Sequence, residues 1–196
     1  MPVNEITLRD LPVPEALPVR RRYWQVHDLI VIGIFAAVIK IASLAVALMG
    51  GGMNPLTLLL KNAVFTSLLV VLLHKVPRFG TLTLFIAVSA VVSLLLMGSG
   101  AILLPASLLA GLASEAVILL VGGYGRTLPI LLGVAVFDLT SKGMALGMSW
   151  LTMREQPALL VTVSIMVVMG YVGALMGLGG GVYFVKELRH AGIVRQ

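Results

Sequence analysis

The sequence contains no cysteine and few charged residues, and both absences narrow the class of protein. Without cysteine, disulfides and thiolate metal sites are excluded. Only 11% of the 196 residues are charged and 59% are hydrophobic, whereas a soluble domain has about a quarter charged residues. Too little polar side chain is present to coat a water-soluble fold. The composition therefore indicates a protein whose solvent is largely lipid.

Several motifs are also missing. No phosphate-binding loop is found, because Gly177–Gly181 is not followed by Lys-Ser/Thr, so we expect no ATP hydrolysis by this chain. The first 27 residues hold Glu5, Asp10, Glu15 and several prolines, which is atypical of a signal or transit peptide. The net charge of +6 does not indicate nucleic acid, because the basic residues flank apolar segments, as in membrane proteins.

Six apolar segments have lengths near the roughly 20 residues of a membrane-spanning helix. They are continuously apolar and do not alternate, which favours helices over a β-barrel. The segments are Leu29–Met49, Leu56–Leu73, Thr81–Met97, Ala101–Val121, Leu128–Trp150 and Ala158–Phe184. The sequence therefore predicts an all-α integral membrane protein with a six-helix domain at 28–185, a polar cytoplasmic arm at 1–27 and a cytoplasmic tail at 186–196.

Two of these helices have recognisable starts. Asp28 precedes the first segment and is expected to be its N-cap, because a carboxylate accepts hydrogen bonds from free amides there. Asn54 and Pro55 precede the second segment, and proline suits the first position of a helix. Both helices are therefore expected to begin at these residues.

The distribution of lysine and arginine predicts the orientation in the membrane. On one side of the membrane, the connections between segments contain a single basic residue, Arg154, in the loop between the last two segments. Ten basic residues fall on the other side: Arg9, Arg20, Arg21, Arg22, Lys75, Arg78, Arg126, Lys186, Arg189 and Arg195. Because basic loops stay in the cytoplasm, both termini are predicted to be cytoplasmic and the number of spans even.

Five ionisable residues lie inside apolar segments, where burying a charge is costly and function is the default hypothesis. Helical rise places Lys40 near the membrane midplane, Lys61 and Lys142 in the outer half, Asp138 one turn deeper than Lys142, and Glu115 toward the inner side. Excluding Glu115, these groups carry three positive charges against one negative charge. A cavity with this balance is expected to bind an anionic substrate.

Each of these residues also has a structural interpretation. Asp138 and Lys142 share a helix face at i, i+4 spacing, so they form either a structural ion pair or a pair that an anion opens. Lys61 is near enough to the outer edge to extend to the headgroups. Lys40 is too deep for this and needs a protein or ligand partner. Glu115 either belongs to a site or stabilises the inner turn.

Small residues form a stripe on the first helix and another on the last. Such stripes let helix backbones approach closely in lipid, so each stripe predicts either internal packing or contact with another subunit. On the first helix the stripe shares its face with Lys40. The residues are Gly33, Ala36, Ala37, Ser43 and Ala47 in the first helix, and Gly170, Gly173, Ala174, Gly177 and Gly181 in the last.

Three segments resemble a known family. They are Asp28–Phe35, the Lys-Val-Pro-Arg-Phe-Gly turn at Lys75–Gly80, and the glycine-rich last helix with its continuation His190–Val194. Together with the order of six short helices, they resemble the S components of energy-coupling-factor (ECF) importers, and more narrowly the MptS/Trep_Strep membrane family. The resemblance covers Asp28 to Val194.

The resemblance implies a substrate-binding subunit in the cell (inner) membrane. It would bind a small micronutrient from the outer side and dock on a membrane T component that works with two cytoplasmic ATPases. Docking in this family uses an Ala-x-x-x-Ala-like face of the first helix, which corresponds here to Gly33 and Ala37. The substrate is left open among vitamins, other cofactors and iron-carrying compounds. The candidate substrate-binding residues are Lys40, Lys61, Asp138 and Lys142. No catalytic residue and no cofactor are expected.

Two other functions compete with transport. A structural or assembly subunit of a larger membrane complex would also use glycine stripes. A membrane enzyme would need converging acid/base or metal-binding groups, but the buried ionisable residues are spread over four helices. His27, His74 and His190 are scattered at the cytoplasmic margin and do not indicate a metal site.

The predicted orientation is tested by single cysteines in this cysteine-free chain. Cysteines at Gly51, Ser99 and Glu155 are expected to react with a membrane-impermeant maleimide added outside intact cells, because these residues lie on the side with few basic residues. Cysteines next to Arg78 and Arg126 are expected to react only after the membrane is opened. The reverse labelling pattern would contradict the predicted orientation.

Overall fold

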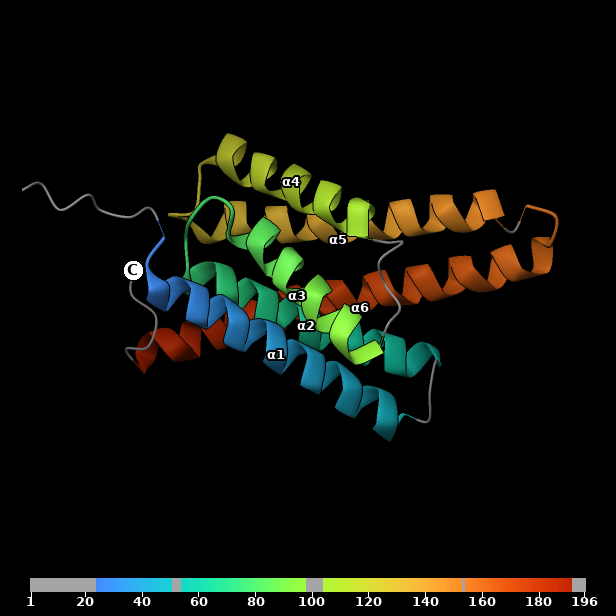
Figure 1. The fold of residues 1–196 in the computed structure, drawn as a ribbon, viewed down its shortest axis with the longest axis horizontal. Coiled ribbons are helices and arrows are strands. Elements are labelled where there is room, and N and C mark those ends of the chain that lie inside the picture. Colours follow the sequence, from blue (N-terminus) through green and yellow to red (C-terminus); the bar gives the residue numbers. More distant parts are fainter. Residues whose placement is uncertain (1–23, 51–53, 98–103, 153, 192–196) are drawn as a thin grey trace, which may run out of the picture.

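The computed structural model describes residues 24–50, 54–97, 104–152 and 154–191, and the regular structure of these residues is entirely α-helical. The predicted fold class is therefore confirmed. The described residues form six helices in a bundle (Figure 1): α1 (Val26–Met49), α2 (Pro55–Lys75), α3 (Thr81–Met97), α4 (Leu104–Val121), α5 (Thr127–Thr152) and α6 (Pro157–His190).

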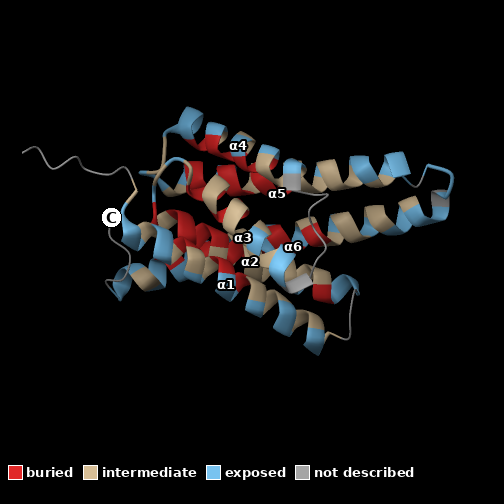
Figure 2. Cartoon of the chain, viewed as in Figure 1, coloured by how far each residue is buried: buried red, intermediate tan, exposed pale blue. Residues whose placement is uncertain are grey.

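Four of the helices, α1, α2, α5 and α6, are long and apolar enough to cross a membrane, and α3 and α4 are shorter apolar helices. The start of α1 and the end of α6 lie at the same end of the bundle (Figure 1), as an even number of crossings requires. At the opposite end, the hairpin of α5 and α6 extends past the other helices. Buried residues are concentrated away from the tip of this hairpin (Figure 2).

The start of α1 differs from the sequence-based expectation, because Gln25 and not Asp28 is the N-cap. Asp28 occupies the third position of the helix, where its Oδ2 accepts a hydrogen bond of 3.1 Å from the Gln25 backbone N–H. The carboxylate thus still compensates the helix terminus, from inside the first turn. For α2 the expectation is confirmed, since Asn54 Oδ1 accepts a 2.8 Å hydrogen bond from the Thr57 N–H.

The last helix is longer than its apolar segment. The tail was expected from residue 186, yet α6 continues to His190. Hydropathy identifies where a chain leaves lipid, but a polar sequence can continue the helix in water. Arg189 and His190 lie in the last turn, where positive charge interacts favourably with the helix dipole.

The glycine stripe of α6 packs internally, against α2. A Cβ atom built on Gly173 would lie 2.3 Å from the Leu59 carbonyl oxygen, and one on Gly177 would lie 2.5 Å from the Ala63 carbonyl oxygen. Ser67 Oγ also donates a 2.9 Å hydrogen bond to the Gly177 carbonyl. These contacts put the two helix backbones against each other, as small-residue interfaces do in membranes.

Gly177→Ala is expected to destabilise the fold, because its methyl group would collide with the α2 backbone. Gly179 is the matched control, since a Cβ atom there meets nothing within 4 Å. We expect Gly177→Ala to cost about 1–3 kcal/mol, the usual range for overpacking, and Gly179→Ala to cost nothing measurable. Thermal unfolding in detergent distinguishes the two, and equal stabilities would contradict the interface.

Candidate functional site

The five ionisable residues of the apolar segments lie on four helices and have different partners. Lys40 belongs to α1, Lys61 to α2, Glu115 to α4, and Asp138 and Lys142 to α5. Glu115 and Asp138 are buried, and the three lysines are half-buried. The contacts of each residue show which of the open interpretations apply.

Glu115 has a structural role. Its Oε1 accepts hydrogen bonds of 2.9 and 3.1 Å from the backbone N–H groups of Leu82 and Thr83, and its Oε2 accepts one of 3.0 Å from the Thr83 hydroxyl. The carboxylate of α4 therefore caps the first turn of α3, where amide groups are free and the helix dipole favours a negative charge. The neighbouring Ser114 donates a 2.6 Å hydrogen bond to the Gly133 carbonyl of α5.

Asp138 and Lys142 form an ion pair within α5, at the i, i+4 spacing read from the sequence. The Lys142 ammonium group also donates a 3.1 Å hydrogen bond to the Gly170 carbonyl of α6. Both side chains are largely removed from solvent, so each depends on the other for compensation of its charge. The pair thereby connects α5 to α6.

Three residues beside this pair were not identified as site residues in the sequence. A Cβ atom on Gly170 would lie 3.2 Å from both Asn62 Nδ2 and Lys142 Cε, so α2, α5 and α6 meet at this level. The centre of the Tyr171 ring lies 6.0 Å from Lys142 Nζ, at the limit of a cation–π contact. Gly170 was noted only for packing, and Asn62 and Tyr171 carry no motif that separates them from other polar residues in apolar helices.

Lys40 and Lys61 form a second group. Lys40 lies on α1 and Lys61 on α2, and these two helices contact each other. Within the described ranges, neither ammonium group has a hydrogen bond or a carboxylate partner. Lys61 and Asn62 are successive residues of one helix, so their side chains leave it in different directions. The structure thus brings Asp138 together with Lys142, whereas Lys40 and Lys61 lie on two other helices that contact each other.

The Gly33 and Ala37 face of α1 does not pack against the described helices. A Cβ atom on Gly33 would meet nothing within 4 Å, and Ala37 is exposed. The buried face of α1 instead carries Ile32, Ala36 and Ile39. This face is therefore free for lipid or for a partner.

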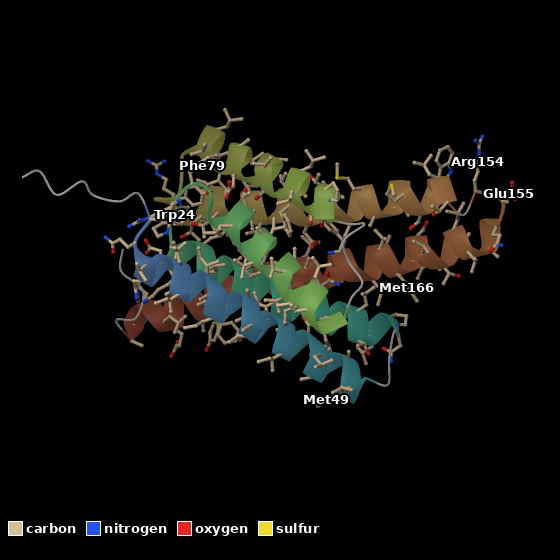
Figure 3. The ribbon with its side chains drawn as sticks, in the orientation of Figure 1. Trp24, Met49, Phe79, Arg154, Glu155 and Met166 are labelled. Carbon is tan, nitrogen blue, oxygen red and sulfur yellow. The ribbon has the colours of Figure 1, made fainter. Side chains whose placement is uncertain are left out.

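The first two segments that carry the family resemblance contact each other. Arg78 Nη1 lies 2.8 Å from Asp28 Oδ2. Gly80 has a φ of +89°, which favours glycine, and a Cβ atom there would lie 3.2 Å from Trp24 Cζ2. Trp24 and Phe79 lie together at this end of the bundle, far from Arg154 and Glu155 at the hairpin tip (Figure 3). The turn at Lys75–Gly80 therefore connects the start of α1 to the start of α3.

This architecture is that of a multi-pass helical membrane protein, and comparison with solved structures agrees. A structure described as the crystal structure of an S-component of ECF transporter matches with a TM-score of 0.62 and 21% sequence identity. The match covers 87% of this chain and 88% of the other. The chain therefore has the S-component fold.

The family follows from the sequence comparison. The family model described as "Hypothetical bacterial integral membrane protein (Trep_Strep)" matches residues 26–158, so the chain belongs to the Trep_Strep family. This confirms the resemblance seen in the sequence. A comparison with curated proteins gives no match.

The ion pair is tested by a double-mutant cycle. Asp138→Asn and Lys142→Met are each expected to lower stability by about 1–3 kcal/mol, because each leaves a buried group of α5 without its partner. The double variant is expected to recover part of this loss, since it leaves no unpaired charge. Thermal unfolding of the purified protein gives all four values, and strictly additive losses would show that the two residues do not interact.

Proposed function

We propose that this chain is the substrate-binding (S) subunit of an ECF-type ABC importer and captures a small anionic micronutrient from the outer side. The observation that carries the proposal is an excess of lysine over carboxylate inside the apolar helices of a bundle that has the S-component fold. The residues concerned are Lys40, Lys61 and Lys142, with Asp138 as the acidic member. These four residues are the proposed substrate-binding residues.

The charge balance of these four residues supports an anionic substrate. Glu115 is occupied by the amides of α3 and does not offset the lysines. The remaining groups carry two positive charges more than negative ones, in surroundings of low dielectric, where attraction for an anion is much stronger than in water. A neutral or cationic substrate would leave this excess uncompensated.

The proposed partners are a membrane T component and two cytoplasmic ATPases, with docking through the face of α1 that carries Gly33 and Ala37. This face is open, which supports docking over internal packing. The alternative of an assembly subunit drew on the glycine stripe of α6, and Gly173 and Gly177 of that stripe lie against α2.

The proposal is tested by co-expression with a T component and its two ATPases. The wild-type chain is expected to co-purify with them and, in native mass spectrometry after gentle solubilisation, to retain a small molecule. Gly33→Leu and Ala37→Leu are expected to reduce recovery of the partners at least about fivefold, because a bulky side chain prevents close helix approach. Both variants should still retain the small molecule.

Gly179→Leu serves as the control, because Gly179 also faces open space but lies on α6. It is expected to leave partner recovery unchanged. Failure of the wild-type chain to recover any partner, combined with no retained molecule, would overturn the proposed function.

A further inference from the structure

The connection between α1 and α2 brings Lys40 and Lys61 to a similar depth. Asn54 Nδ2 donates a 2.6 Å hydrogen bond to the Gly50 carbonyl, and Thr57 Oγ1 lies 3.4 Å from the same oxygen. These contacts close the hairpin, so the two helices run antiparallel from this point. Counted from the hairpin, the two lysines differ in depth by about one helical turn, which their long side chains span.

These two lysines differ from Lys142 in what surrounds them. The ammonium group of Lys142 has a carboxylate and a carbonyl as acceptors. In the described parts of the chain, the ammonium groups of Lys40 and Lys61 have neither kind of acceptor. Two like charges held together in an apolar layer are costly, and the cost is relieved when an anion lies between them.

Lys40 also has a particular position around α1. The helical turn of about 100° per residue places it between the buried side, marked by Ala36, and the open side, marked by Gly33 and Ala37. Its half-buried side chain therefore lies at the border of the face that is proposed to dock. Lys61 is half-buried as well, and it lies one helical turn after Thr57, which contacts Gly50 at the end of α1.

We propose that Lys40 and Lys61 together form an oxyanion site that binds the carboxylate or phosphate group of the substrate and links α1 to α2. This inference rests on the proposed substrate-binding function and deepens it, because it assigns the anionic group of the substrate to two of the four proposed residues. A carboxylate or phosphate has separate oxygen atoms for two ammonium groups, and such charge-assisted hydrogen bonds are among the strongest in proteins.

The test measures thermal unfolding of the full chain in neutral detergent, with sodium phosphate or sodium acetate against sodium chloride at equal ionic strength. Wild-type protein is expected to be stabilised by the oxyanions beyond the effect of chloride. Lys40→Met and Lys61→Met are each expected to raise the apparent dissociation constant for phosphate at least about tenfold. Lys186→Met is expected to keep the wild-type value, since Lys186 is exposed near the end of α6.

A charge reversal provides an independent measurement. Lys61→Glu places a carboxylate beside Lys40, so we expect this variant to unfold at a higher temperature than wild type in chloride and to lose the response to phosphate. An equal phosphate response in wild type, Lys40→Met and Lys61→Met would overturn the proposal. Loss of the response in Lys186→Met to the same extent would overturn it too, because the effect would then be general screening.

Phospholipid headgroups also contain phosphate, so a second experiment distinguishes binding of a lipid headgroup from binding of free phosphate. The protein is placed in vesicles of phosphatidylcholine, with or without phosphatidylglycerol. The proposal expects phosphate to stabilise the protein in both, with the same dependence on Lys40 and Lys61. Stabilisation by phosphatidylglycerol alone, with no effect of free phosphate, would overturn it.

Partner recovery and molecule retention by the wild-type chain do not depend on this measurement, so failure of the oxyanion site and failure of the proposed function are distinguishable.

Discussion

The contact between α2 and α6 positions the α6 carbonyl that accepts a hydrogen bond from Lys142. Gly173 and Gly177 let the two backbones touch, and a side chain at either position would collide with a carbonyl of α2. The same approach brings Gly170 beside Asn62 and exposes its carbonyl to the Lys142 ammonium group. Lipid provides no hydrophobic drive between helices, so small residues determine how closely they pack. This packing fixes the position of the Lys142–Gly170 contact, one turn away from Gly173.

The charged groups inside the bundle fall into two kinds once their partners are known. Glu115 caps α3 and Asp138 compensates Lys142, so both acidic groups are occupied within the fold. Lys40 and Lys61 have no such partner among the described residues. Because an uncompensated charge in an apolar layer is costly, the proposed binding of an anion follows from the residues that the fold leaves unpaired.

The family resemblance has a physical basis in contacts that hold one end of the bundle together. Arg78 and Asp28 form an ion pair between the turn and the start of α1, and Gly80 adopts a positive φ beneath Trp24. Replacing glycine there would strain the backbone and press a methyl group on the indole. Two of the three segments that carry the resemblance therefore contact each other at one end of the bundle.

The sequence by itself determined the features that depend on composition and local spacing. Lipid requires backbone groups to be satisfied within a helix, so six continuous apolar segments predicted six helices, and i, i+4 spacing predicted the pair of Asp138 and Lys142. Features that depend on how helices rotate against each other came only from the tertiary structure. The inward-facing glycine stripe, the cap that Glu115 provides and the hydrogen bond from Lys142 to Gly170 are of this kind. Each joins different helices, and small-residue stripes and lone charges look alike in a sequence whether they face a neighbour, a partner or lipid.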